Sequence, residues 1–236
     1  MSFAVTLPSR RIVGGLALLA GIALYGNTAV AAEGKLYPSG PPNGVAYLRF
    51  VNLAPQEVTI TSPAAKLALP TDEAHRAGEF DPVPPGVALT GSAQLGEATK
   101  PINLTLAANE FATVAVSADG ADGVTLTVFR ETPSDFNALK SSIGLFNADK
   151  GCEKAQLVAG DNHQTVIPDI APGATGRRLV NPVNVALGVA CGDPAQAVPA
   201  KLGQLSAGDR YSVFVVAKGS GHDVVAVRDE QAPFRP

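Results

Sequence analysis

Three segments in the first half of this 236-residue chain return in the second half, each after about one hundred positions. The matched segments are residues 45–52 (VAYLRFVN) with 142–147 (SIGLFN), 106–116 (LAANEFATVAV) with 205–216 (LSAGDRYSVFVV), and 124–133 (VTLTVFRETP) with 224–233 (VVAVRDEQAP). This spacing is the size of one small β domain and is too long for a stacked solenoid repeat. The chain is therefore expected to contain two copies of one domain.

Apolar and polar residues alternate along many short segments that are bounded by Gly, Pro, Asn and Asp. Examples of the apolar faces are Ile102, Leu104 and Leu106; Val124, Leu126 and Val128; and Val183, Val185, Leu187 and Val189. A period of two predicts half-buried antiparallel strands. About seven such segments occur in each half, and no convincing amphipathic helix is present beyond a possible turn near residues 135–140. We expect an all-β protein with two tandem antiparallel β-sandwich domains of Ig-like type.

The first thirty-odd residues are typical of a secretory signal peptide. Arg10-Arg11 precedes an apolar run over residues 12–25, and small residues end at Ala31-Ala32. The apolar run is shorter than the roughly twenty residues that a membrane-spanning helix needs, although an uncleaved anchor is the alternative. The expected organisation is a signal peptide at 1–31, an N-terminal domain at 32–134 and a C-terminal domain at 135–236, with export to the periplasm.

Two cysteines, Cys152 and Cys191, lie in the second half. In an oxidising compartment they are expected to form a disulfide, which would stabilise the protein by about 4 kcal/mol in the chain-entropy model. Two free buried thiols are the alternative. A metal site is not expected, because no CxxC or close pair of histidines accompanies the cysteines.

Charge is distributed unevenly between the two halves. Residues 33–135 have a net charge of −6 and residues 136–236 a net charge of +1. The acidic first half would repel nucleic acid and other polyanions, so no nucleic-acid partner is expected. Arg177-Arg178 is the only adjacent basic pair after the signal segment.

The sequence contains no recognisable catalytic or cofactor-binding motif. The three histidines are isolated from one another, and neither a GxSxG nucleophile motif nor a P-loop occurs. His222-Asp223 could be a base with its orienting carboxylate, but a polar hairpin loop is the favoured interpretation. Tyr37, Tyr47 and Tyr211 could contact sugars, although tyrosines in such strands more often belong to the core. No catalytic residue, cofactor or metal is predicted.

Two Pro/Gly-rich segments, residues 36–44 and 169–182, precede strands. Either they present loops to a partner or they are rigid connections within the β domains. On the first interpretation, the candidate partner-binding residues are Tyr37, Arg49, Arg177 and Arg178.

Residues in and near these segments carry a likeness to a known family. They are Leu36-Tyr37, Pro42, Gly44, Tyr47, Arg49 and Asn52, and then Asp169, Ala171-Pro172, Gly176, Arg178, Asn181-Pro182-Val183 and Val185. With them the chain resembles the alginate biosynthesis protein AlgF family. The resemblance implies a periplasmic accessory protein of polysaccharide O-acetylation that works beside a membrane-bound O-acyltransferase and periplasmic SGNH-type acetyltransferases. It implies no active-site residues. The cysteine pair departs from the family pattern and leaves open another polymer, such as acetylated cellulose.

The hypothesis is therefore a non-catalytic periplasmic adaptor in O-acetylation of an exopolysaccharide, with alginate as the expected polymer. The first alternative is a carbohydrate-binding module, which the absence of Trp and the presence of only four Tyr disfavour. The second is an enzyme whose site is built from dispersed residues. Polymer contact is expected to be weak.

Overall fold

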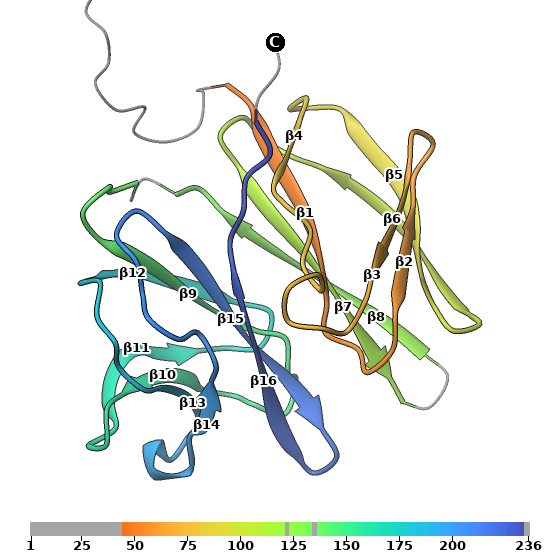
Figure 1. Cartoon of the computed structure of the whole chain (residues 1–236). Coiled ribbons are helices and arrows are strands. Elements are labelled where there is room, and N and C mark those ends of the chain that lie inside the picture. The colour runs from red at the N-terminus through yellow and green to blue at the C-terminus, as the bar shows by residue number, and fades with distance from the viewer. Residues whose placement is uncertain (1–43, 121–122, 134–135, 234–236) are drawn as a thin grey trace, which may run out of the picture. The chain divides into compact units, whose positions relative to one another are not determined.

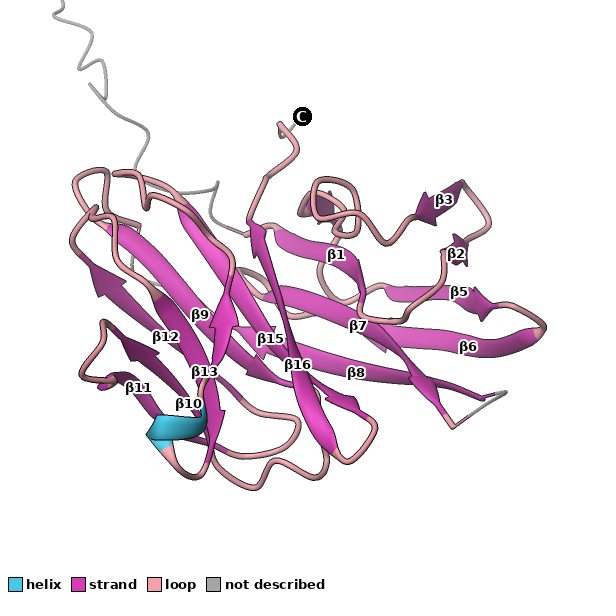
Figure 2. Cartoon of the chain, turned by 60° about the horizontal axis from the view of Figure 1, so that its bottom comes forward, coloured by secondary structure: helices cyan, strands magenta, loops and turns pink. Residues whose placement is uncertain are grey.

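The computed structural model describes residues 44–120, 123–133 and 136–233, all of which belong to one compact unit. The expected signal peptide and Tyr37 lie outside these residues. The described chain holds sixteen strands and one short 3-10 helix, Pro194–Gln196, which is cyan in Figure 2. No helix in these ranges is long and apolar enough to cross a membrane.

The first half forms two four-stranded sheets that face each other (Figure 1). One sheet has the order β4-β1-β7-β8 and the other the order β3-β2-β5-β6. The strands are β1 (Ala46–Asn52), β2 (Val58–Thr61), β3 (Lys66–Leu69), β4 (Asp81–Val83), β5 (Ala88–Leu95), β6 (Ala98–Thr105), β7 (Phe111–Asp119) and β8 (Gly123–Glu131).

The second half repeats this arrangement. Its sheets have the orders β12-β9-β15-β16 and β11-β10-β13-β14. The strands are β9 (Ser141–Asn147), β10 (Ala155–Ala159), β11 (Gln164–Ile170), β12 (Thr175–Val180), β13 (Leu187–Cys191), β14 (Val198–Ala200), β15 (Arg210–Lys218) and β16 (Gly221–Arg228). Adding eight to each strand number of the first half gives the strand order of the second half in both sheets.

This topology confirms the internal repeat and the β-sandwich fold. Each half has eight strands where the sequence pattern indicated about seven. Most neighbouring strands are antiparallel, as expected, but each half also contains one parallel pair, β1 with β7 and β9 with β15. Parallel neighbours need a long crossover, and here the other sheet's strands supply it.

Two asparagines mark the repeat at the atomic level. The side-chain amide of Asn52, at the end of β1, donates to the carbonyls of Gln56 and Leu69 at 2.8 Å each. The amide of Asn147, at the end of β9, donates to Cys152 O at 2.6 Å and Ile170 O at 2.9 Å. Both asparagines are fully buried, and each ties the loop after its own strand to the end of a strand in the opposite sheet. They thereby give backbone carbonyls of both sheets and loops a hydrogen-bond partner.

Each half has its own core between its two sheets, and a third apolar cluster joins the halves. The third cluster contains Val51, Leu53, Ala115, Phe129, Phe146, Phe214, Val225 and Val227. The rings of Phe146 and Phe214 stack with centroids 4.8 Å apart, and Phe129 meets Phe146 edge-on at 5.3 Å. The sheets that contain β1 and β9 are therefore covered on both faces, which explains why every residue of β9 is buried.

The end of the chain returns to the first half. Gln231 forms a parallel bridge with Phe80, just before β4. Phe80 N–H donates to the carbonyl of Glu230 at 2.8 Å, and Ala232 N–H donates to the carbonyl of Phe80 at 3.1 Å.

One detail of the strand prediction is wrong. Residues 183–186 are not in a strand, Val183 is 42% exposed, and β13 begins only at Leu187. Val124, Leu126 and Val128 alternate along β8 as predicted, although Val128 is 37% exposed. β8 packs toward the core of the first half at Val124 and Leu126, and toward the second half at Phe129.

Candidate site between the two halves

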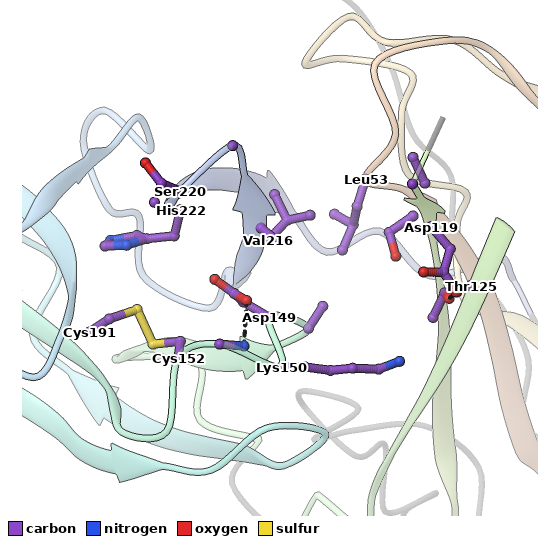
Figure 3. Close-up of a pocket in the computed structure, with 18 of the residues that line it drawn as sticks. Leu53, Asp119, Thr125, Asp149, Lys150, Cys152, Cys191, Val216, Ser220 and His222 are labelled. Atoms are coloured by element: carbon purple, nitrogen blue, oxygen red, sulfur yellow. Dashed lines mark hydrogen bonds between the residues drawn. A yellow bond between two sulfur atoms is a disulfide. The ribbon is translucent and has the colours of Figure 1, made fainter. Parts of the chain in front are cut away.

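A cavity of about 670 Å³ lies at one end of the contact between the halves. The hairpin turns β7–β8 and β15–β16 form two of its walls, and the loops after β1 and β9 form the others. Figure 3 shows Asp119 and Thr125 on the side of the first half, with Ser220 and His222 on the side of the second half. Its position between two repeated hairpins makes it a candidate for a functional site in the described chain.

The polar side chains of this cavity are mostly engaged with local partners. Asp119 accepts from the hydroxyl of Thr125 at 2.8 Å. Asp149 is buried and accepts from the backbone N–H of Gly151 at 2.8 Å. Lys150 is exposed and extends toward the side that carries Asp119 and Thr125 (Figure 3). Two carboxylates in one cavity make it unfavourable for an anionic ligand.

His222 does not form a catalytic pair in the described chain. Its Nε2 lies 3.4 Å from the carbonyl of Val189, and the neighbouring Asp223 forms an ion pair with Lys218 at 2.7 Å. The hydrogen bond from Lys218 holds the pKa of Asp223 below its usual range. Lys218 and Gly221 are paired across the turn, and Gly219 takes a φ of +58°, which glycine adopts without strain. The GSGHD segment is thus the polar hairpin loop that the sequence favoured.

Within residues 44–120, 123–133 and 136–233, no group of three potential metal-ligating side chains occurs. Ser117, Ser220 and Thr125 line the cavity, but among the described residues the hydroxyl of Thr125 donates to Asp119 and His222 lies against the carbonyl of Val189. The arrangement therefore lacks the nucleophile–base contact on which acyl transfer through a side chain depends.

The cysteines form the expected disulfide, with an S–S distance of 2.00 Å and a separation of 39 residues. Cys152 follows β9 and Cys191 ends β13, so the bond ties the loop after one sheet to a strand of the other sheet. Both cysteines also line the cavity (Figure 3). The disulfide consequently fixes one wall of the candidate site.

A buried ionic network crosses the contact between the halves away from this cavity. It links Arg49 and Glu131 of the first half to Arg177 and Asp229 of the second. Arg49 of β1, which is 1% exposed, donates from Nη1 to Asp229 Oδ1 at 2.8 Å. It also donates to the hydroxyls of Thr113 at 3.0 Å and Ser212 at 2.7 Å. The guanidinium lies over the ring of Phe80, 4.2 Å from its centroid. Every side of this cation is thus occupied within the protein.

Arg177 of β12 completes the network from the other half. It donates from Nε to Glu131 Oε1 at 2.8 Å and from Nη2 to Asp229 Oδ2 at 3.2 Å. Gly144 leaves the space that the Arg177 side chain occupies, because a Cβ at that position would lie 2.8 Å from Arg177 Nη2. Each half therefore contributes one arginine and one carboxylate.

Asp229 is ionised at the centre of this network. Burial, the largest single influence, would raise its pKa, but the attraction of the Arg49 and Arg177 guanidiniums together with the hydrogen bonds from Ser212 and Arg49 outweighs burial and holds the pKa below its usual range. The network thus meets the condition for buried charge, since each charge is paired and hydrogen-bonded.

The candidate partner-binding residues are separated by this arrangement. Arg49 and Arg177 are buried in the network and are not presented on the surface, so their proposed contact with a partner stays untested and their environment favours a structural role. Arg178 is exposed and donates to the carbonyl of Val166 at 2.8 Å. Residues 169–182 are not a free loop, because they contain the end of β11, a short turn at 171–174 and the whole of β12. Tyr47 and Tyr211 are core residues, at 0% and 4% exposure.

Sequence reasoning missed Glu131 and Asp229. They occupy equivalent positions in the two hairpins. Leu126 pairs with Val116 in the first half as Val224 pairs with Val215 in the second, and Glu131 and Asp229 each lie five residues after Leu126 and Val224. The ungapped sequence match aligns Pro133 with Pro233 and is two residues out of register with the strand pairing. An alignment with a gap at the hairpin would have paired the two carboxylates.

The fold and the cavity define a two-sandwich β protein in which one topology is duplicated and the halves share a buried interface. Comparison with known sequences assigns this protein to a family. A family profile described as "Alginate O-acetyl transferase AlgF" matches residues 19–211. The chain belongs to the AlgF family.

Two relatives carry the name "Alginate biosynthesis protein AlgF". The protein from Pseudomonas fluorescens is 29% identical over 229 residues, which cover 97% of each chain. The protein from Pseudomonas syringae pv. tomato is 26% identical over 221 residues and covers 93% of this chain and 92% of its own. A structure of the C-terminal domain of AlgF from P. aeruginosa covers 38% of this chain and 98% of its own length, with 26% identity and a TM-score of 0.33.

Proposed function

We propose that this protein is a non-catalytic periplasmic adaptor in the O-acetylation of alginate. Membership of the AlgF family supports a role in alginate biosynthesis, and the relatives' names describe a biosynthesis protein rather than a specific enzyme. The profile's description names an acetyl transferase, so the question of catalysis rests on the site.

The observation that carries the proposal is the apolar contact between two sandwiches, together with a cavity at its end that shows no nucleophile–base pair among the described residues. Domains joined by a large apolar interface do not rotate freely. A rigid body of this kind can hold a membrane-bound O-acyltransferase and a periplasmic SGNH-type acetyltransferase at a fixed separation. That arrangement raises the effective concentration of each enzyme for the other without any chemistry by the adaptor.

The carbohydrate-binding alternative receives no support from aromatic residues. Sugar-binding modules commonly use exposed aromatic rings, but Tyr47 and Tyr211 are buried and the sequence has no Trp.

Reconstitution tests the adaptor role. Acetyl transfer to the polymer is measured with the membrane acyltransferase and the periplasmic acetyltransferase, with and without this protein. We expect a clear increase when the protein is added, and recovery of both enzymes in one complex only in its presence. The variants His222→Ala and Ser220→Ala should support transfer fully. Acetyl transfer by the purified protein alone, abolished by either substitution, would refute the proposal.

A further inference from the structure

An apolar pocket of about 420 Å³ opens from the core of the first half, between β4, β5 and the β2–β3 turn. Its apolar walls include Leu48, Phe50, Ile60, Leu67, Leu89 and Ile102. Leu48, Ile60 and Ile102 belong to the buried core, while Phe50 and Leu89 are half-buried and pack against it. Leu67 is 39% exposed. Apolar surface of this kind gains free energy when a bound group removes it from water.

Asp81 brings a negative charge to this pocket, and it is the one ionisable side chain among the described residues that line it. In the β1–β4 register it pairs with Leu48, so both side chains point to the face of the sheet that carries the core. Partial burial raises the pKa of Asp81 above its ordinary value. None of the ion pairs found within residues 44–120, 123–133 and 136–233 involves this carboxylate. A cation from outside would compensate the charge.

The internal repeat places a cation at the position that corresponds to Asp81. Leu48 and Ile143 each lie four residues before the buried asparagines that mark the repeat, and Leu48 pairs with Asp81 as Ile143 pairs with Arg178. Arg178 donates from Nη1 to the carbonyl of Val166 at 2.8 Å, and so links β12 to β11. A carboxylate only accepts hydrogen bonds, so Asp81 cannot make the corresponding link to a carbonyl of β3.

Apolar side chains of the second half also cover the place that stays open in the first. Ile170 of β11 packs against the core and lies so close to β12 that a Cβ on Gly176 would meet its Cδ1 at 2.7 Å. Val185, between β12 and β13, packs against the same core. In the first half, Val87 lies in the connection between β4 and β5 and is 49% exposed. The first half therefore leaves room for a group that its own described residues do not supply.

The edge of β3 shows how a peptide could enter this room. β3 is the last strand of its sheet, so one side of its backbone is not paired with another strand of the described chain. Leu67 of β3 pairs with Ile60 of β2, and both line the pocket. An extended segment along this edge can pair with the free backbone groups and place alternate side chains in the pocket. β4 is less suited to such pairing, because Pro82 has no N–H.

We propose that this pocket receives an extended segment of a partner protein, in which an apolar side chain fills the pocket and a neighbouring Lys or Arg pairs with Asp81. An apolar centre with a charged rim is typical of protein interfaces. The net charge of −6 over residues 33–135 favours the approach of a basic segment. The inference deepens the adaptor role, on which it rests for the existence of a partner, and gives the first half a docking site of its own.

Site-specific cross-linking of the full chain in its own cells identifies the occupant. The photoreactive amino acid benzoylphenylalanine replaces Ala64, which is exposed and lines the pocket. After irradiation, mass spectrometry locates the cross-linked site in the partner. We expect a segment of another protein in which an aliphatic or aromatic residue stands beside a Lys or Arg. A cross-linked segment without such a cation would contradict the proposal.

A charge reversal tests the role of the carboxylate. Asp81→Lys should abolish the cross-link, whereas Glu97→Lys makes the same change in net charge at an exposed position of the β5–β6 turn and should preserve it. With the two purified acetylation enzymes measured separately, Asp81→Lys should weaken the binding of one enzyme about tenfold and leave the other unchanged. If Asp81→Lys lowers the melting temperature, Asp81→Asn replaces it, because it removes the charge at nearly constant size.

A cross-link to a second copy of this chain, or to residues 1–43 of the same chain, would assign the pocket to that occupant and overturn the proposal. The absence of any protein cross-link would do the same. Equal losses in Asp81→Lys and Glu97→Lys would indicate an effect of net charge alone, and would also overturn it. Wild-type protein that binds neither enzyme would refute the adaptor role, but the cross-linked segment would still decide what the pocket binds.

Discussion

Arg49 and Asp229 are 180 residues apart in sequence, and their side chains form a buried ion pair at 2.8 Å. Arg49 belongs to the first strand of the first half, and Asp229 follows the last strand of the second half. The pair therefore fastens the beginning of the described chain to its end.

Replacement of Asp229 by Ala should lower the free energy of unfolding by about 3–5 kcal/mol, because Arg49 and Arg177 would stay buried without a counter-charge. Urea denaturation measures this loss. Asp223→Ala is the matched control, since its ion pair with Lys218 is exposed and should contribute about 0–1 kcal/mol. Equal effects of the two substitutions would contradict the role of the network.

Stability should also depend on pH through Asp229. The folded state holds the pKa of Asp229 below its usual range, so the unfolded state binds a proton more readily. The stabilisation is therefore present above the unfolded pKa of about 3.9 and is lost as the pH falls through the folded pKa. The difference in unfolding free energy between wild type and Asp229→Asn should stay constant from pH 7 to about pH 5 and narrow below about pH 4. A difference that stays constant down to pH 2 would refute this assignment.

The aromatic cluster between the halves should govern their cooperativity. Phe146→Ala removes a fully buried ring that contacts Phe129 and Phe214, and it should cost about 3–5 kcal/mol. Wild-type protein should unfold in one calorimetric transition because the halves share this interface, whereas the variant should show two. Leu139→Ala, at a position that is 79% exposed, should change stability by less than about 0.5 kcal/mol.

The disulfide should stabilise the second half. Replacement of both Cys152 and Cys191 by Ser should lower the free energy of unfolding by about 2–4 kcal/mol. A reductant should shift the urea midpoint of the wild type toward that of the variant and leave the variant unchanged. An identical midpoint for both proteins without reductant would exclude the contribution.

The repeat, the β-sandwich class and the disulfide could be predicted because each is visible over short stretches of sequence. The contact between the halves could not. Tyr47, Arg49 and Val51 lie on one face of β1, and a strand with an arginine on one face indicates solvent exposure in an antiparallel sheet. The second half covers that face, and the carboxylate that neutralises Arg49 lies far along the chain. Local periodicity shows which residues share a face but not whether another sheet covers it.

The candidate partner residues illustrate the same limit. Arg177 and Arg178 are adjacent in sequence, but their side chains point to opposite faces of β12, as successive residues of a strand do. One is inside the ionic network and the other lines a surface pocket. The adjacency of two charges therefore carried less information than the register of the strand that contains them.

The bridge between Phe80 and Gln231 has a consequence for the order in which the protein matures. A ribosome makes residue 80 long before residue 231, so the first half must wait for the last segment of the chain before its edge beside β4 is covered. A chain that stops short of residue 229 lacks both this cover and the counter-charge of Arg49. Incomplete translation products thus expose an unfinished edge in the part of the chain that was made first.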